Sequence, residues 1–363
     1  MLDASTFSEM LDYFQGLEGT QYWVVVPMVL LAGLALLAYG GDWLADGAAS
    51  LASNFRVEPV VIGITVVSIA TSAPELFICL IAGFRDEGDS LVLGNIVGSN
   101  LANIALILGI AAVIFPIGGR PRYYFWEIPW LIFATATFVW VCQKDIERYE
   151  GIIMIGMMIG YLVVTIRLRS FFMKVLGLIY KILGILKDLD NVRIGYFDEL
   201  DEVEDRSTHS AWGLVLGGTI ALLIGAQFLV DSAQSISMTL EVNQGYIGLT
   251  VVAIGTSLPE LAAAVAAARK QQTGLIAGNI FGSNLFNMLF VGGVTATASP
   301  IEWDGTLKKE IFLMLGVTVL LALVFQRRRD GVLEMGRVAG LLLILFYFGI
   351  LVYSGINLEA QAQ

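Results

Sequence analysis

Ten apolar segments, each about as long as a bilayer is thick, dominate the 363-residue sequence. A helix needs about 20 consecutive apolar residues to cross a membrane, and about 17–25 is the usual range. The ten segments are residues 22–40, 58–83, 91–116, 123–142, 150–168, 211–239, 245–268, 275–299, 309–326 and 335–354. Because lipid offers no water to unpaired backbone groups, such segments cross as helices. The sequence therefore predicts an all-α integral membrane protein with ten transmembrane helices.

Composition supports a membrane fold and argues against other classes. Hydrophobic residues make up 57% of the chain and charged residues only 15%, whereas soluble domains average about 45–50% and about 25%. The net charge of −11 argues against nucleic acid as a partner, since phosphate binding needs a basic surface. The two cysteines, Cys79 and Cys142, lie in apolar segments, so we expect buried thiols without a redox role.

The chain contains two copies of one unit. Residues 57–76 match residues 242–261 at 12 of 20 positions, and residues 94–103 match residues 278–287 at 8 of 10. Each copy holds five segments, and since five is odd, the second copy enters the membrane from the opposite side. We therefore expect two inverted five-helix repeats, an arrangement found in secondary transporters with sites near the bilayer midplane.

The repeat divides the chain into four parts. They are an extracytoplasmic N-terminal segment (1–20), a first five-helix repeat (21–169), a cytoplasmic linker (170–210) and a second, inverted five-helix repeat (211–363). The linker begins with an apolar stretch that we expect to lie in the membrane interface. It continues with an acidic stretch that is either a solvated linker or a regulatory cation site.

Basic residues distinguish the two faces of the membrane. Loops on one side hold 16 Lys and Arg residues, and loops on the other side hold 5. The positive-inside rule places the first side in the cytoplasm. We therefore expect a multi-pass protein of the cell (inner or plasma) membrane, with the lipid bilayer as a partner and both termini extracytoplasmic.

Two glutamates, Glu75 and Glu260, lie inside predicted spans at equivalent places in the two copies. A charged side chain at the bilayer centre costs roughly 2.5–3.5 kcal/mol on insertion scales. Four spans rich in small and polar residues contain or neighbour these glutamates, and none of the four includes Lys or Arg. We expect these spans to face the protein interior and the carboxylates to bind a mobile cation or protons. Two protonated glutamates with a purely structural role are the alternative.

Residues near each glutamate supply further oxygen ligands. Each Glu ends a Thr-Ser-x-Pro-Glu stretch, in which Thr and Glu are four apart and share a helix face. Pro74 removes a backbone N–H, so we expect the helix to break there and to free the carbonyls of Ser68 to Thr71. The next span of each copy carries Ser and Asn four apart. The predicted ion-binding residues are Thr71, Ser72, Glu75, Ser99, Asn103, Thr256, Ser257, Glu260, Ser283 and Asn287.

All of these donors are hard oxygen atoms. Because the set contains no His or Cys, zinc and copper do not fit. Ca2+ takes about 6–8 oxygens in flexible geometry and fits better than Mg2+, which keeps its waters. Two carboxylates balance one Ca2+ or two monovalent ions, so either loaded form relieves the repulsion in the empty site. We expect no cofactor beyond the transported ions, and a monomer. Four glycines (Gly94, Gly98, Gly278 and Gly282) should let the neighbouring helices approach closely.

At these residues the sequence resembles the calcium/cation antiporter superfamily, in its bacterial and archaeal sodium/calcium exchanger branch. Its hallmark stretches, G-T-S-x-P-E and G-N-x-x-G-S-N-x-x-N, occur once in each copy, with Ala70 in place of the first Gly in the first copy. The resemblance implies ten helices in inverted repeats, four ion subsites formed by the residues named above, and exchange of Ca2+ for Na+ by alternating access. It also implies that the first and sixth spans slide against the core. The acids of those spans (Asp42, Asp46 and Asp231) could equally lie at helix ends near headgroups.

These residues leave the identity of the coupling ion, Na+ or H+, open. Relatives can carry Asp at the end of the second motif, whereas Asn103 and Asn287 leave only two formal negative charges. A cycle of 3 Na+ per Ca2+ would load a net positive charge, and a 2:1 cycle would not. The proton-coupled branch also uses two Glu and two Asn, but it usually carries Glu where this chain has Gly-Ser, so we favour Na+ over H+.

Two further hypotheses are a cation channel and a structural or signalling membrane protein with a vestigial site. No enzyme signature occurs: the sequence has no GxxxxGK, HExxH or nucleophile elbow. We therefore expect a protein that is not an enzyme.

Overall fold

The computed structural model describes most of the chain, with gaps at the ends and in several loops. The described residues are 10, 13, 14, 16, 17, 19–84, 89–119, 126–168, 206–239, 253–303, 305–327 and 333–361. Most of the expected N-terminal segment and linker, and the start of the expected span 245–268, lie outside them.

The described part is mostly helical. Its first half contains α2 (Gly19–Phe55), α3 (Pro59–Ile62), η1 (Gly63–Val67), α4 (Ser68–Thr71), α5 (Ala73–Gly83), α6 (Asp89–Leu101), η2 (Ala102–Ile107), α7 (Leu108–Ile114), α8 (Ile128–Val141), α9 (Arg148–Val163) and η4 (Val164–Leu168). Its second half contains α11 (Thr208–Thr239), α13 (Ala253–Thr256), α14 (Leu258–Arg269), α15 (Thr273–Leu285), η7 (Phe286–Val291), α16 (Gly292–Ala298), α17 (Lys308–Val324) and α18 (Arg337–Gln361).

By length and apolar composition, five helical stretches of the described part could each cross a membrane, and one bent pair could form a sixth crossing. The five are Gln21–Phe55, Asp89–Ile114, Arg148–Arg167, Thr208–Ile236 and Thr273–Ala298, and the bent pair is Pro59–Thr71 with Ala73–Gly83. Burial sorts them. In Asp89–Ile114 and Thr273–Ala298, 83% and 94% of the most apolar stretch is buried, against 28% in Gln21–Phe55. For these two of the small-residue spans, the expectation that they face the protein interior is confirmed.

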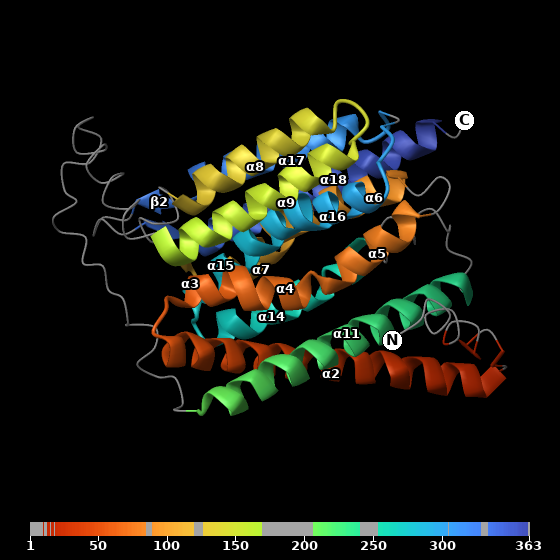
Figure 1. Ribbon diagram of the computed structural model, residues 1–363. Coiled ribbons are helices and arrows are strands. Elements are labelled where there is room, and N and C mark those ends of the chain that lie inside the picture. The colour runs from red at the N-terminus through yellow and green to blue at the C-terminus, as the bar shows by residue number, and fades with distance from the viewer. Residues whose placement is uncertain are drawn as a thin grey trace.

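Helices α2 and α11 pack against each other in antiparallel orientation. A Cβ placed on Gly33 would lie 2.9 Å from the carbonyl oxygen of Gly225, and one on Gly40 would lie 2.9 Å from that of Gly218. Rising residue numbers on one helix meet falling numbers on the other. Glycines let the two backbones touch, as is usual for helices that associate in lipid. Figure 1 shows this pair, red and green, crossing along one side of the bundle.

The first span was expected to cover residues 22–40. The predicted end is wrong, because α2 continues to Phe55 as one helix of 37 residues. Glycines and acids follow the apolar residues from position 40 onward, and this pattern predicts the end of a span. In the structure, Gly40 packs on α11 and Asp46 forms an ion pair, so neither ends the helix.

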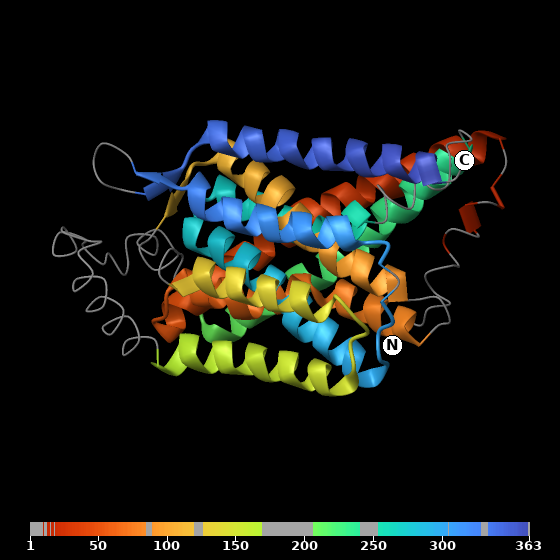
Figure 2. The same ribbon diagram turned by 90° about the horizontal axis from the view of Figure 1, so that it is seen from above.

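The helices that carry the expected site pack between this pair and an outer layer. Figures 1 and 2 show α8, α9, α17 and α18 on the side away from α2 and α11. Two glycine contacts tie the outer layer to the interior in both halves. Gly109 of α7 meets Gly340 of α18, and Gly293 of α16 meets Gly151 of α9. These contacts occupy equivalent positions of the two repeats.

A second close approach brings the two repeats together. A Cβ on Gly278 would lie 2.5 Å from the carbonyl oxygen of Val60, and one on Gly282 would lie 2.6 Å from Cα of Ile64. The close packing expected at Gly278 and Gly282 is thereby confirmed. The segment equivalent to this contact in the second repeat is 245–249, which lies outside the described residues, so the expectation for the two glycines of the first repeat stays a prediction.

The expectation of an entirely helical protein is wrong in one detail. A three-stranded antiparallel sheet, in the order β1-β3-β2, joins β1 (Ile117–Gly119), β3 (Leu333–Met335) and β2 (Gln326–Arg327). Ile117 pairs with Met335, and both side chains are buried. Two loops that the helices bring to the same end of the bundle pair there because extended backbone needs hydrogen-bond partners. In Figure 1, β2 lies at the end opposite to the start of α2 and the end of α18.

Candidate cation site

Both expected site glutamates follow a break in a helix. Ser72, with φ −88° and ψ 10°, separates α4 from α5, and the helical stretches on either side are bent by 47°. Ser257, with φ −89° and ψ 7°, separates α13 from α14 in the same way. The prolines Pro74 and Pro259 lie in the first turn of the following helices, where a missing N–H costs no helical hydrogen bond. The break predicted from Pro74 is confirmed and recurs in the second half.

The break frees fewer carbonyl groups than expected. The carbonyl of Ser68 accepts a hydrogen bond from the backbone N–H of Ser72 at 2.9 Å. A proline removes only the bond to the residue four positions earlier, which is Ala70 for Pro74. The prediction that the carbonyls of Ser68 to Thr71 all become available is therefore wrong at Ser68.

Asn103 and Asn287 each occupy the second position of a π-helical turn, in η2 and η7 respectively. Such a turn inserts one extra residue into a helix and is frequent at functional sites. Both asparagines are fully buried. The sequence gives no direct signal for these turns, since the residues around them have ordinary helix propensity.

All ten expected ion-binding residues are described, and the structure buries every one of them. Even Thr256, which is more exposed than the others, has only 8% of its surface accessible. Two of the ten lie in direct contact across the halves, because Oγ of Ser72 donates a hydrogen bond to Oε1 of Glu260 at 3.1 Å. Ser72 lies three residues before Glu75, and both glutamates are fully buried. The fold therefore brings the two glutamates to one place in the interior.

Many polar atoms of this cluster have no hydrogen-bond partner within the part of the chain that the structure describes. They are both carboxylate oxygens of Glu75, Oε2 of Glu260, the hydroxyls of Ser99 and Ser257, and the amide groups of Asn103 and Asn287. Each buried polar group left without a partner costs about 1–3 kcal/mol. A cluster of such groups around two carboxylates is therefore a site that a cation would stabilise.

Sequence reasoning missed two asparagines beside this cluster, the buried Asn279 and the half-buried Asn95. The amide oxygen of Asn279 accepts hydrogen bonds from Thr71 (3.3 Å) and Ser283 (3.4 Å). That of Asn95 accepts one from Thr256 (3.5 Å). A signal was available, because each asparagine lies four residues before the serine of its motif and shares its helix face.

The acids of the first span lie close to Lys270, a partly exposed residue at the end of α14. Nζ of Lys270 lies 2.7 Å from Oδ1 of Asp46 and 3.6 Å from Oδ1 of Asp42. Lys270 also donates a hydrogen bond to the backbone carbonyl of Asp42 at 3.1 Å. The equivalent acid of the second half, Asp231, is 3% exposed and accepts a hydrogen bond from Gln227. These acids lie within long helices, so the reading that places them at helix ends is wrong.

We expect Asp46→Asn to lower the unfolding temperature in detergent more than Asp42→Asn, because Asp46 is closer to the ammonium group. Both effects should be small, since a partly exposed ion pair contributes about 0.2–1 kcal/mol. Thermal unfolding followed by tryptophan fluorescence measures both. In a Lys270→Met background the two variants should no longer differ, and a difference that persists there would assign it to another contact.

The fold and the site together define a membrane protein with a buried, carboxylate-centred oxygen cluster built from two related halves. A family model described as "Sodium/calcium exchanger protein" matches residues 25–167 and 210–355. The chain belongs to this family, which is a family of transporters rather than enzymes.

Individual relatives cover nearly the whole chain. The putative antiporter CaxA of Alkalimonas amylolytica is 33% identical over 90% of this chain and 97% of its own length. The sodium/calcium exchanger MaX1 of Methanosarcina acetivorans is 29% identical over 90% of this chain and 97% of its own. Among solved structures, the sodium-calcium exchanger NCX_Mj is 26% identical and superposes with a TM-score of 0.72, covering 90% of this chain and 97% of that one.

Proposed function

We propose that this chain exchanges Ca2+ for Na+ across the cell membrane by alternating access. One observation carries the proposal: two buried carboxylates from opposite halves, surrounded by oxygen atoms whose hydrogen-bonding capacity the described residues leave unused. A calcium ion accepts about 6–8 such oxygens in flexible geometry and neutralises both charges. The names of the relatives MaX1 and NCX_Mj support Na+ as the counter-ion.

The proposed ligands are the ten residues expected from the sequence. They are Thr71, Ser72, Glu75, Ser99 and Asn103 from the first half, and Thr256, Ser257, Glu260, Ser283 and Asn287 from the second. The ions are substrates, and the proposal includes no resident cofactor.

The architecture proposed for this cycle is ten spans in two inverted five-helix repeats, 21–169 and 211–363, joined by a cytoplasmic linker at 170–210. The antiparallel packing of α2 on α11 supports the inverted relation, since equivalent helices of inverted repeats run in opposite directions. We place the protein in the inner or plasma membrane as a monomer, with segment 1–20 and both termini outside the cytoplasm, because that orientation puts most basic residues inside.

Two carboxylates balance one Ca2+ or two Na+, so we expect exchange of two Na+ per Ca2+ that moves no net charge. The test uses purified protein in Na+-loaded liposomes, with 45Ca2+ uptake measured as the outward Na+ gradient is varied. We expect uptake to follow the Na+ gradient and to be unaffected by a K+ diffusion potential set with valinomycin. Uptake that slows with a negative interior, as a cycle of three Na+ per Ca2+ would require because it exports one positive charge, would contradict the two-for-one cycle.

Exchange of Ca2+ for protons is the second candidate, because Asn103 and Asn287 leave Glu75 and Glu260 as the carboxylates of the proposed ligand set, and carboxylates also bind protons. The same liposomes decide between them. Uptake driven by a pH gradient at equal Na+ on both sides would establish protons as the counter-ion. Ca2+ currents in a planar bilayer without any counter-ion gradient would establish a channel.

A further inference from the structure

Two asparagines outside the proposed ligand set contact its hydroxyl groups across the boundary between the repeats. On α15, the amide oxygen of Asn279 accepts hydrogen bonds from Oγ1 of Thr71 and Oγ of Ser283, at 3.3 and 3.4 Å. On α6, the amide oxygen of Asn95 accepts one from Oγ1 of Thr256 at 3.5 Å. Each asparagine therefore accepts a hydrogen bond from a threonine of the other repeat.

We propose that Asn95 and Asn279 are positioning residues for the transported cation. A hydroxyl group has one hydrogen and two lone pairs. The Thr71 hydroxyl has two acceptors within reach, and Oδ1 of Asn279 at 3.3 Å is closer than the carbonyl oxygen of Ser68 at 3.5 Å. Once the asparagine oxygen accepts the hydrogen, only lone pairs of the threonine are left to face a further partner, and lone pairs are what a cation binds. The proposal rests on the proposed function, because it assigns these residues a role toward the transported ion.

Burial makes this orientation effective. Asn279 is 2% exposed and Thr71 and Ser283 are fully buried, so no bulk water competes for the hydroxyl hydrogens. Oγ of Ser68 lies 2.8 Å from the backbone carbonyl oxygen of Gly63 and 3.2 Å from that of Asn279, so α15 packs closely against η1 and α4 at this level. Asn279 therefore couples the position of one repeat to the ligand geometry of the other.

The two asparagines are held differently. Nδ2 of Asn95 donates a hydrogen bond to Sγ of Cys79 at 3.3 Å. The residue equivalent to Cys79 in the second half is Ala264, whose methyl group accepts no hydrogen bond. Nδ2 of Asn279 is buried, and the described residues offer it no partner.

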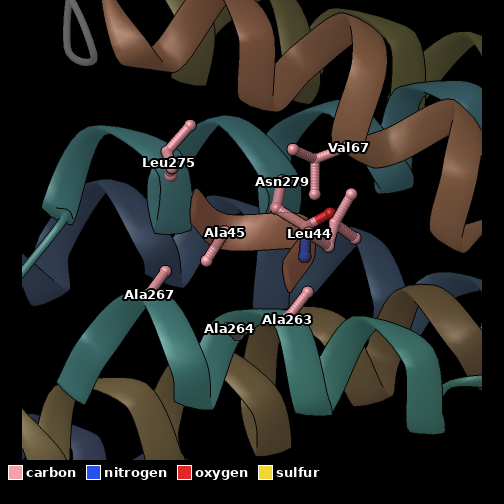
Figure 3. A pocket seen from close by; sticks show the side chains of 8 residues that line it. All are labelled: Leu44, Ala45, Val67, Ala263, Ala264, Ala267, Leu275 and Asn279. Carbon is pink, nitrogen blue, oxygen red and sulfur yellow. The ribbon is translucent and has the colours of Figure 1, made fainter. Parts of the chain in front are cut away.

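A small cavity lies beside Ala264, the residue that is equivalent to Cys79 of the first half. Its volume is about 10 Å3, and Leu44, Ala264 and Asn279 are among its lining residues (Figure 3). This volume is at the lower limit for one water molecule. Figure 3 shows the amide nitrogen of Asn279 directed toward α14, the helix that carries Ala264. The amide nitrogen of Asn279 therefore lacks the hydrogen bond that the amide nitrogen of Asn95 makes to Cys79.

The test measures the apparent KM for Ca2+ and the maximal rate of 45Ca2+ uptake in Na+-loaded liposomes. Asn279→Leu keeps the side-chain shape but removes the acceptor, and we expect the KM to rise about tenfold, as for other groups that orient metal ligands. In a Thr71→Val/Ser283→Ala background, Asn279→Leu should change the KM no further, since no hydroxyl is left to orient. Equal effects in both backgrounds would overturn the proposal.

Asn284→Leu is the matched control. Asn284 lies on the same helix and is equally buried, but its amide donates to the carbonyl of Ile280 in its own helix. We expect an unchanged KM, and a rise as large as that of Asn279→Leu would mean that any buried asparagine on α15 is merely structural. A wild-type protein that transports no Ca2+ would refute the proposed function, whereas transport with an unchanged KM in Asn279→Leu would refute only the positioning role.

A second variant keeps the inference testable if Asn279→Leu does not fold. Ala264→Cys places a sulfur acceptor in the cavity, at the position that Cys79 has in the first half. We expect a higher unfolding temperature and a lower KM for Ca2+, and the KM gain should vanish in the Thr71→Val/Ser283→Ala background. An unchanged KM with a raised unfolding temperature would show that holding Asn279 does not affect the ion.

Discussion

Replacing Glu75 or Glu260 with glutamine is expected to weaken Ca2+ binding by about two to three orders of magnitude and to reduce uptake into liposomes to background. Glutamine keeps the size of the side chain but removes its charge. Removing one partner of a buried charge pair costs about 3–5 kcal/mol, and about 1.4 kcal/mol corresponds to tenfold in affinity. Each glutamate is fully buried, so solvent screens the loss little.

Glu127→Gln provides the matched control for this prediction. Glu127 is also fully buried, but it lies next to α8 and accepts a hydrogen bond from Tyr161, outside the oxygen cluster. Glutamine can still accept that bond, so we expect uptake close to that of the wild type. Uptake that survives in both Glu75→Gln and Glu260→Gln would show that the ion binds elsewhere.

Gly282→Ala is expected to reduce transport by about 100-fold, through the contact between the repeats rather than through a ligand. The added Cβ would lie 2.2 Å from Oγ of Ser68 and 2.6 Å from Cα of Ile64. The serine could rotate, but the backbone of η1 would have to move away from α15. A misplacement of about 1 Å in a preorganised site can cost about 100-fold in rate. Uptake of 45Ca2+ per milligram of monodisperse protein measures the effect.

The control here is Gly316→Ala, at an exposed position of α17. In the described part of the structure, a Cβ on Gly316 would meet no atom within 4 Å. We expect normal transport, with the helix stabilised slightly by the loss of a glycine. Full activity in Gly282→Ala would mean that the repeats tolerate a wider separation than the site geometry implies.

The sequence predicted the centre of the structure well, because the constraints there are local and repeated. A proline one residue before each glutamate is enough to predict a helix break, and the break occurs at Ser72 and Ser257. Carboxylates in apolar spans without basic neighbours must meet in the interior. The duplicated motif therefore predicted which side chains the fold buries together.

Contacts between helices were beyond the reach of such reasoning. The acids of α2 were expected to follow the end of the first span. They lie inside a 37-residue helix, where Gly40 packs on α11 and Asp46 pairs with Lys270 at the end of α14. Asn95 and Asn279 were missed for the same reason. Their threonine partners lie in the other repeat. The spacing of four residues to the serine of each motif indicates a shared helix face, but it does not show which threonine each asparagine contacts.

Equilibrium binding of 45Ca2+ to the purified protein tests the central claim most directly. If one cluster built from Glu75 and Glu260 serves both ions, one Ca2+ should bind per chain, and Na+ should displace it with a steep, cooperative dependence on concentration. The Glu75→Gln/Glu260→Gln protein should bind no Ca2+ under the same conditions. Ca2+ binding that persists in this double variant, or that Na+ leaves unchanged, would contradict a shared site at the two glutamates.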